Sequence, residues 1–506
     1  MESPGRSARI PRGIPGSARS PLNKMTSVKR TLTAESLREV GTRLQQAHKA
    51  FQRRYPGAPG ERQPVHVVYG GAHLFRSNTI RRLGEMALKS VEDYAPDFRA
   101  FAKALGLPGA ETLPNAEDAV AASAQAVEAD PAAVRRENRA AWFAYTVYQR
   151  VREKLRREPI EDFRIDFEDG YGIRPDDEED RHAAAAAEQI GIAKNDGQLP
   201  PFIGIRIKPL TEELRERSMR TLDIFLTELA ERTRGELPKP LYVTLPKVTL
   251  PDEVAALADT CSRLEPMLDL EPGALRIEVM IETPQAIFNE RGETNLLPLV
   301  SAARGRCVAA HFGPYDYTAS RNIASVHQPL RHFASDFARE VMQVALAGTG
   351  IRLGDGPTNI MPIAPHRAKN GAQLGVRQNE ENRAAVQRAW KIHFDNVSRS
   401  LAHGFYQGWD LHPAQLPPRY AAVYAFFLEN LEPAAERLRN FVEKAAQATR
   451  VGQVFDDAAM AQGLVNYFRQ AIGCGALSAD EVQGLTGVSE PELRGGSFLK
   501  ILENRR

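Results

Sequence analysis

The chain has 506 residues, of which 42% are hydrophobic and 26% charged, and its formal net charge is +2. This near-neutral balance excludes the strongly basic surface that is typical of proteins binding nucleic acid or anionic membranes. No apolar run approaches the roughly 20 residues that a membrane-spanning helix needs, so we expect a cytoplasmic protein.

The N-terminal residues 1–30 are rich in Arg, Ser and Pro, and Glu2 is their single acid. Such a segment cannot bury a core, which predicts a disordered tail. An organelle transit peptide has a similar composition and remains an alternative, as does a translation start at Met25. We expect an N-terminal helix and linker over residues 31–63.

Eight β-like runs alternate with helical stretches from residue 64 onward. They are PVHVVYGG (64–71), DFRIDFED (162–169), PFIGIRIK (201–208), PLYVTLPK (240–247), ALRIEVMIE (274–282), RCVAAHFG (306–313), GIRLGDGP (350–357) and HGFYQGWDLHP (403–413). This alternation predicts an α/β fold, and eight units predict a (β/α)8 TIM barrel over residues 64–416. We expect a helical insertion at about 95–160 and a C-terminal helical region over 417–506.

The alternation within the strands indicates a barrel that opens onto a site. In RIEVMIE, Ile277 and Val279 share one face, while Glu278 and Glu282 fall on the other. Strands of doubly wound sheets usually read as continuous apolar runs instead. Charges near the strand ends are typical of a barrel lumen that leads into an active site.

Several polar residues stand at the predicted carboxyl ends of the strands. They are Asp166, Glu168, Asp169, Arg206, Lys208, Lys247, Glu282, His311, Asp316, Asp410 and His412. The carboxylates among these residues offer only oxygen ligands, which suits Mg²⁺ or Mn²⁺. The sequence shows no His or Cys spacing of the kind that binds zinc. A network of ion pairs without a metal is the alternative.

The three cysteines, Cys261, Cys307 and Cys474, are scattered without a CxxC pair, which favours a reducing compartment. We interpret each of them as a small buried hydrophobic residue.

The ordered motifs DFEDG, GIRIKP, TLPKV, MIET, HFGPYDY and WDLHPAQL resemble the superfamily of citrate lyase β-subunits and malate synthases. Its members share a phosphoenolpyruvate/pyruvate-type TIM barrel. The resemblance spans about residues 64–420, and the length of the chain is similar to that of a long subgroup of unassigned substrate.

The resemblance implies roles for individual residues. Glu282 and Asp316 match the carboxylates that bind Mg²⁺, and Arg206 matches the arginine that holds the substrate carboxylate or carbonyl oxygen. The remaining matches are the acidic cluster Asp166, Glu168 and Asp169, which holds metal-bound water and positions the substrate, and His412, which approaches a CoA-type ligand or locks the final turn.

Some positions depart from the family pattern. Lys208 replaces a frequent Asn and adds an anion contact for the substrate. The histidine base of the related 2-oxoacid aldolases has no counterpart in DFEDG, so the base is unassigned, and His311 is a candidate beside the acidic cluster. Asp456 and Asp457 are candidate counterparts of the catalytic aspartate of malate synthase.

Lys247 has two interpretations, an anion-binding or structural residue and the Schiff-base nucleophile of a class I aldolase. Taken together, the motifs imply a Mg²⁺-dependent carbon–carbon lyase or aldolase that acts on a 2-oxoacid or an acyl-CoA-related carboxylate through a metal-stabilised enolate. An acyl-CoA thioesterase, a malate-synthase-like condensing enzyme and a non-catalytic metabolite-binding barrel are the alternatives. We also expect a homo-oligomer.

Overall fold

The computed structural model describes residues 31–57, 61–368, 373–451 and 458–505. Contacts divide the chain into two compact units, residues 1–54 and 55–506. Helix α1 (Arg38–Arg54) belongs to the first unit, and none of its residues is buried. The predicted disordered tail, residues 1–30, lies outside the described residues.

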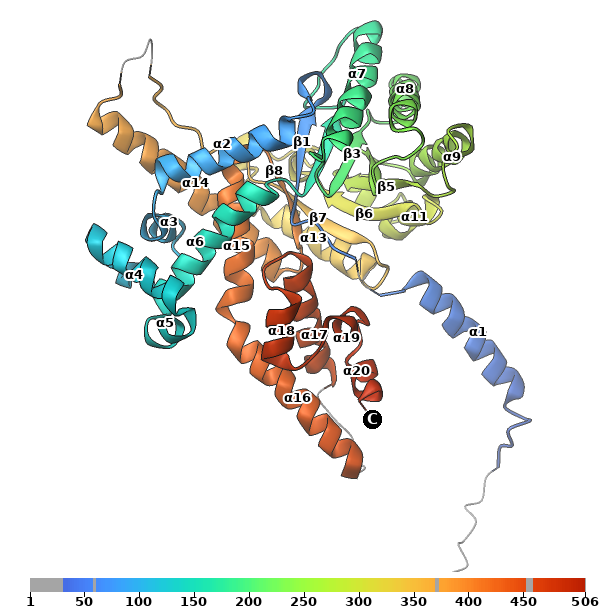
Figure 1. Cartoon of the computed structure of the whole chain (residues 1–506). Coiled ribbons are helices and arrows are strands. Elements are labelled where there is room, and N and C mark those ends of the chain that lie inside the picture. Colours follow the sequence, from blue (N-terminus) through green and yellow to red (C-terminus); the bar gives the residue numbers. More distant parts are fainter. Residues whose placement is uncertain (1–30, 58–60, 369–372, 452–457, 506) are drawn as a thin grey trace, which may run out of the picture. The chain divides into compact units, whose positions relative to one another are not determined.

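The second unit is built around a closed barrel of eight parallel strands (Figure 1). They are β1 (His66–Gly71), β2 (Asp162–Asp166), β3 (Phe202–Arg206), β4 (Leu241–Leu245), β5 (Leu275–Ile281), β6 (Cys307–Phe312), β7 (Arg352–Pro357) and β8 (Gln407–Asp410). Each strand pairs with its neighbours in sequence, and β1 pairs with β8 to close the ring. The predicted TIM barrel is therefore confirmed.

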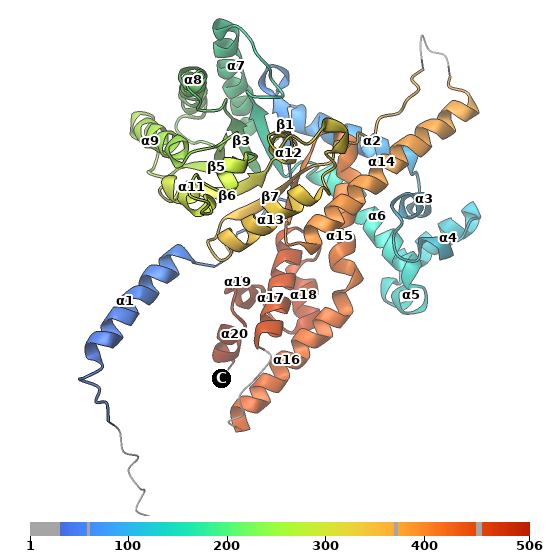
Figure 2. The ribbon, with the colours of Figure 1, turned by 180° about the vertical axis from the view of Figure 1, so that it is seen from behind.

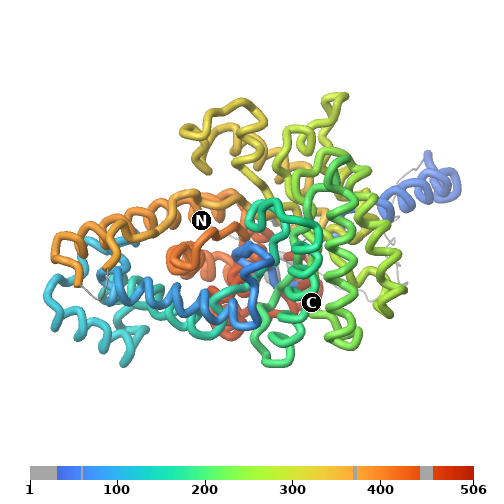
Figure 3. The backbone as a smooth tube through the Cα atoms, turned by 90° about the horizontal axis from the view of Figure 1, so that it is seen from above, coloured from blue at the N-terminus to red at the C-terminus, as the bar shows by residue number. Residues whose placement is uncertain are grey.

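Helices follow the strands and cover the outer face of the barrel. They are α2 (Thr79–Tyr94), α7 (Asp176–Asn195), α8 (Arg215–Thr233), α9 (Pro251–Met267), α10 (Pro284–Ile287), α11 (Leu296–Ala302), α12 (Pro314–Ala319), α13 (Phe333–Leu346), α14 (Val376–Ala402) and α15 (Leu416–Glu429). Helix α7 packs against α8, and α9 packs against α11. Seen from above, the green segments that contain α7, α8 and α9 lie together (Figure 3). The view from behind shows α13 beside β7 (Figure 2).

Further helices lie outside the eight units. Between β1 and β2 these are α3 (Phe98–Leu105), α4 (Glu117–Ala129), α5 (Pro131–Glu137) and α6 (Arg139–Arg157). After α15 come α16 (Leu431–Val451), α17 (Ala458–Gly473), α18 (Ala479–Thr486), α19 (Glu490–Arg494) and α20 (Phe498–Asn504). Helix α6 packs against α15, and α17 packs against α19 and α20. Within the described residues, no helix combines the length and apolarity needed to cross a membrane.

The strands are buried on both faces, with apolar side chains on the outer face and polar or charged side chains on the inner face. Outward residues such as Phe163, Ile205 and Val279 pack beneath the helices in the hydrophobic core, as their period-two spacing predicts. Inward residues include buried charges, which the barrel must pair. The three cysteines are also buried and form no disulfide, as expected.

The middle of the lumen holds a set of mutually paired side chains, which we call the lumen network: Tyr69, Asp162, Arg164, Thr244 and Glu278. The guanidinium of Arg164 forms ion pairs with Asp162 and, at 3.3 Å, with Glu278. Nε of Arg164 also donates to the hydroxyl of Thr244 at 2.9 Å. Thr244 and Tyr69 in turn donate to Glu278 at 2.8 and 3.2 Å. The lumen network therefore fills the middle of the barrel with buried, paired polar side chains.

Candidate active site

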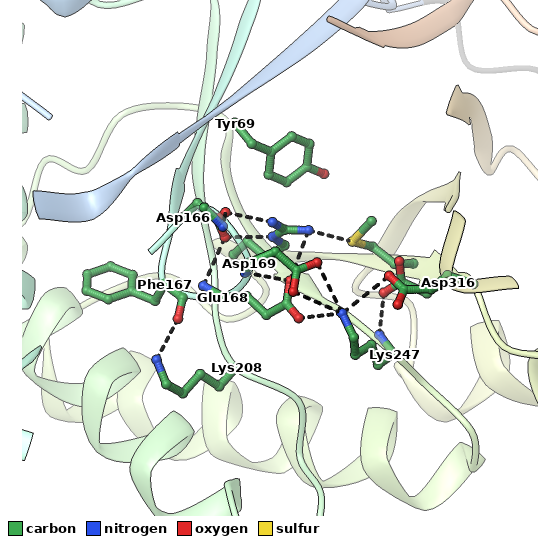
Figure 4. Close-up of polar contacts among 12 residues, drawn as sticks. Tyr69, Asp166, Phe167, Glu168, Asp169, Lys208, Lys247 and Asp316 are labelled. Carbon is green, nitrogen blue, oxygen red and sulfur yellow. Dashed lines mark hydrogen bonds and ion pairs between the residues drawn. The ribbon is translucent and has the colours of Figure 1, made fainter. Parts of the chain in front are cut away.

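Seven charged side chains gather where β2 to β6 end, and we call them the mouth cluster (Figure 4). Its members are Asp166, Glu168, Asp169, Arg206, Lys247, Glu282 and Asp316. Because the carboxyl ends of parallel strands meet at one end of a barrel, residues from separate motifs meet there.

Arg206 is held rigidly at the base of the mouth cluster. Its Nε and Nη2 donate to the two carboxylate oxygens of Asp166 at 2.7 and 2.6 Å, a bidentate pair. Asp166 also accepts the backbone N–H groups of Glu168 and Gly170 at 3.0 and 2.8 Å. The remaining nitrogen, Nη1, lies 3.2 Å from Glu168. Asp166 therefore acts as the residue that orients Arg206.

Two aromatic rings pack against the guanidinium of Arg206. The sequence analysis did not identify either of them as a site residue. The guanidinium lies 4.6 Å from the ring centre of Tyr69 on β1 and 5.4 Å from that of Trp409 on β8. Aromatic faces attract a guanidinium and restrict its motion. The alternation in HVVYGG places Tyr69 inward, but only the closed barrel shows that it meets an arginine of β3.

Lys247 lies among the carboxylates of the mouth cluster. Its Nζ is 2.5 Å from Glu168, 3.2 Å from Asp169 and 3.3 Å from Asp316. Its backbone N–H donates to Glu282 at 2.6 Å. The backbone takes a left-handed conformation, with φ of 50°, which is uncommon for a residue with a Cβ. One residue thus contacts carboxylates through both its backbone and its side chain.

The charges around Lys247 decide its protonation. Burial lowers the pKa of its ammonium, but the carboxylates, led by Glu282 and Glu168, outweigh burial and leave the pKa above its ordinary value. A Schiff-base lysine needs the neutral amine at working pH. The structure therefore favours the anion-binding or structural interpretation of Lys247.

Glu282 lies directly after β5 and is buried, with 2% of its surface exposed. Burial raises the pKa of Glu282 to about 8, and the negative charge of Asp316 acts in the same direction. A Cβ at Gly313 would lie 2.3 Å from Oε2 of Glu282. The glycine of HFGPYDY therefore provides the space in which this carboxylate sits.

Asp316 and Asp169 form the open side of the mouth cluster. Asp316 lies on α12, directly after β6, and its side chain is 42% exposed. The side chain of Asp169 is 61% exposed. The carboxylates thus form a gradient from the buried Glu282 to the solvent.

The donor set of the mouth cluster fits a divalent cation. Its five carboxylates, Asp166, Glu168, Asp169, Glu282 and Asp316, face two cations, Arg206 and Lys247. Excess carboxylate oxygens of this kind attract Mg²⁺ or Mn²⁺. Among the described residues, no group of three or more His, Cys, Asp or Glu side chains is already arranged around one metal position. The ammonium of Lys247 lies between the carboxylates instead.

Lys208, predicted to bind substrate, lies apart from the mouth cluster (Figure 4). Its Nζ donates to the carbonyl oxygen of Phe167 at 2.6 Å and lies 2.8 Å from Glu179 on α7. Tyr171 packs its ring 5.0 Å from the same ammonium. These contacts direct Lys208 toward the outer helix layer and fasten the loop after β2.

The two candidate histidines have different settings. His311 is buried in the lumen, with its ring centre 6.3 Å from Tyr69 and 6.0 Å from Trp409, and burial lowers its pKa. Neither of its ring nitrogens has a hydrogen-bond partner among the described residues. His412 caps a short turn by accepting the N–H of Ala414 at 3.1 Å. Asp456 and Asp457 lie outside the described residues.

Comparisons with known proteins give a family and a set of distant structures. A family model described as "Domain of unknown function (DUF6986)" matches residues 44–501. No curated protein matches the chain.

Solved structures similar to this chain include a ternary complex of Haloferax volcanii malate synthase with pyruvate and acetyl-CoA. It is 16% identical, with a TM-score of 0.36, over 52% of this chain and 61% of the malate synthase, less than two thirds of its length. A Mycobacterium tuberculosis CitE protein with magnesium and pyruvate is 16% identical, with a TM-score of 0.32, over 52% of this chain and 81% of its own. Similarity at this level assigns no activity to the present chain.

Proposed function

The chain belongs to the DUF6986 family, and we propose that it is a Mg²⁺- or Mn²⁺-dependent enzyme that makes or breaks a carbon–carbon bond next to a carbonyl group. The observation that carries this proposal is the mouth cluster, in which excess carboxylates surround a rigid arginine at the catalytic end of a TIM barrel. The sequence resemblance to citrate lyase β-subunits and malate synthases supports the same class of reaction.

The metal would be held by Glu282 and Asp316, with Asp169 as a further oxygen donor. The side chain of Lys247 would then turn away from the position it shares with the cation. A bound divalent cation supplies positive charge beside a substrate carbonyl, which makes a neighbouring carbon–carbon bond easier to form or break.

Arg206 would bind the substrate carboxylate. Asp166 occupies the Nε and Nη2 edge of the guanidinium, and Nη1 contacts Glu168. An incoming substrate oxygen would therefore bind at Nη1 and share it with Glu168. Tyr69 and Trp409 keep the guanidinium in place while substrate enters and product leaves. Fixed positive charge of this kind stabilises a developing anion without rearrangement during the reaction. A 2-oxoacid satisfies both the arginine and the metal ligands.

The proton carrier would be an acid of the mouth cluster whose pKa is raised by burial and which does not hold the metal. Burial raises the pKa of Glu168 as well as that of Glu282. Glu168 lies between Arg206 and Lys247 and is therefore placed to exchange a proton with substrate. His311 lies below this level and contacts aromatic rings, which favours Glu168 for the role.

The proposal is tested by thermal unfolding of the full chain with EDTA or Mg²⁺, in the presence of pyruvate, oxaloacetate, glyoxylate, malate or acetyl-CoA. A ligand at a hundred times its Kd stabilises the folded state by about 2.7 kcal/mol. We expect a 2-oxoacid to stabilise the wild type only with Mg²⁺, and Asp316→Asn to remove that effect. Stabilisation by acetyl-CoA together with glyoxylate would favour a condensing enzyme.

Asp177→Asn is the matched control, because Asp177 is an exposed acid on α7 that pairs with Arg181 outside the mouth cluster. It should respond to Mg²⁺ and substrate as the wild type does. Equal responses of the wild type and Asp316→Asn would contradict the metal site. Substrate binding with no turnover of any tested compound would favour a metabolite-binding barrel.

A further inference from the structure

A cavity lies at the opposite end of the barrel from the mouth cluster. It has a volume of about 400 Å³, within the range of small-molecule sites. Its walls come from the residues that precede β1, from the loops that lead into β7 and β8, and from α17 and α19 of the C-terminal helices. We call this cavity the floor pocket.

Four arginines line the floor pocket, and they differ in how they are paired. Arg62 forms ion pairs with Glu158 and Glu161. Arg494 pairs with Glu490 at 2.6 Å. These two therefore carry little uncompensated charge.

The other two arginines keep donors to spare. Arg352 donates from Nη2 to the hydroxyl of Tyr242 at 2.7 Å, but its buried Nε has no partner among the described residues. Arg469, on α17, makes no ion pair or side-chain hydrogen bond with any described residue. Burial lowers the pKa of its guanidinium, which no neighbouring carboxylate offsets. A half-buried guanidinium without an anion is costly to maintain.

The acids of the lining do not pair with Arg469, whereas the charge of Arg352 is also felt by Asp162 and Glu278 in the lumen. Glu490 is paired with Arg494, and Glu61 is exposed. The rest of the wall includes apolar side chains, namely Leu346, Ile351, Leu353, Ile472 and Leu493. The floor pocket thus combines unpaired arginine donors with an apolar wall.

We propose that the floor pocket binds a small organic anion that carries one carboxylate or phosphate head and a short apolar body. The fork of Arg469 would receive the oxyanion head, since guanidinium groups match the geometry of both carboxylate and phosphate. The apolar body would lie against the leucine and isoleucine side chains. Because the mouth cluster is at the other end of the strands, this ligand is distinct from the substrate.

The test measures binding of hexanoate and hexyl phosphate to the full chain by calorimetry at constant ionic strength. EDTA is present throughout, so that metal-dependent binding at the mouth cluster does not contribute. Hexanol lacks the charged head, and inorganic phosphate lacks the apolar body. We expect saturable binding of one charged probe with one site per chain, and at least tenfold weaker binding of hexanol and inorganic phosphate. The tighter of the two probes identifies the head group.

Variants locate the binding. Arg469→Gln should weaken binding at least tenfold, and Arg469→Lys should recover part of the loss. Arg81→Gln removes an exposed arginine of α2 that pairs with Glu85, and it should bind as the wild type does. Asp316→Asn should also bind normally, which separates the floor pocket from the mouth cluster.

A second substitution keeps the test decisive if Arg469→Gln does not fold. Gln470→Glu adds a carboxylate to the lining beside Arg469 and should also weaken binding at least tenfold. Absence of saturable binding by both charged probes would overturn the proposal. So would an unchanged affinity in a folded Arg469→Gln or in Gln470→Glu.

Discussion

Glu278 and Glu282 belong to the same strand-derived segment, project to the same side and are both almost fully buried, yet their surroundings give them opposite properties. Burial raises the pKa of both. At Glu278 the charge of Arg164, with smaller contributions from His311 and Thr244, outweighs burial and lowers the pKa. At Glu282 burial dominates, Asp316 adds to it, and the pKa is raised to about 8.

This difference separates charges that complete the fold from charges that remain available to a ligand. In the lumen network each acid has an arginine or hydroxyl partner, so its charges are used within the protein. In the mouth cluster, by contrast, Glu282 accepts the backbone N–H of Lys247, and the side chains of Asp169 and Asp316 are open to solvent. Charged residues at a barrel end are therefore informative about function when they are counted together with their partners.

The largest expected effect is on the lumen network. Arg164→Met would leave Asp162 and Glu278 buried without their shared cation, and we expect the free energy of unfolding to fall by about 3–5 kcal/mol. Urea unfolding followed by circular dichroism measures this change. Adding Asp162→Asn and Glu278→Gln to the same protein should restore part of the loss. A loss below about 1 kcal/mol would show that the lumen network is weakly coupled to folding.

The next effect is the loss of stability when the metal is removed. It is tested with the same Glu→Gln substitution at Glu278, within β5, and at Glu282, directly after β5. EDTA should lower the stability of the wild type by about 2.7 kcal/mol relative to Mg²⁺ at a hundred times its Kd. Glu282→Gln should abolish this difference, whereas Glu278→Gln should retain it. Thermal unfolding of the three proteins with and without Mg²⁺ provides the measurement. Equal Mg²⁺ responses in the two variants would remove the distinction between the two glutamates.

Glu278→Gln should also change the acid dependence of stability. Because the folded-state pKa of Glu278 lies below its ordinary value of 4.5, ionised Glu278 adds stability that is fully present above about pH 4.5 and is lost as pH falls through the lower folded-state value. Its charge-assisted contacts predict a loss of about 2 kcal/mol at pH 7 in the variant. Urea unfolding from pH 3 to 7 should show the wild type and the variant converging at the acid end. A constant difference across this range would contradict the assignment.

The smallest expected effect tests the backbone of the mouth cluster. Lys247→Gly and Lys247→Ala both remove the ammonium, but glycine adopts the left-handed conformation without steric cost. We expect the glycine variant to be more stable than the alanine variant by about 1 kcal/mol. The comparison is made by urea unfolding in EDTA. Equal stability would indicate that the loop after β4 relaxes when the side chain is lost.

Much of the fold follows from patterns within single segments, and much of the site does not. The alternation of eight β-like runs with helical stretches was sufficient to predict the eight strands. Because the strands are parallel, it also predicted that Glu282 and Asp316 lie at the same end of the barrel. The pairing of Arg164 with Glu278 depends on the stagger of β2 against β5, which no local pattern contains.

Lys208 illustrates the same limit. Its spacing from Arg206 predicts a second inward cation, but the structure joins it to Glu179. The first turn of α7 carries four acids, Asp176, Asp177, Glu178 and Glu179, and negative charge is favourable at the start of a helix. That position explains why α7 begins there, while the ion pair between Glu179 and Lys208 depends on how α7 packs beside β3.

The two rings beside Arg206 belong to the first and last strands of the barrel, which pair with each other, with Val67 opposite Trp409. During synthesis on the ribosome, Tyr69 and Arg206 emerge long before Trp409. A nascent or truncated chain that ends before residue 409 therefore contains the acids of the mouth cluster. It lacks Trp409, one of the two rings that hold the guanidinium of Arg206. Assembly of the mouth cluster is in this way coupled to closure of the barrel, so that incomplete chains lack the complete arrangement around Arg206.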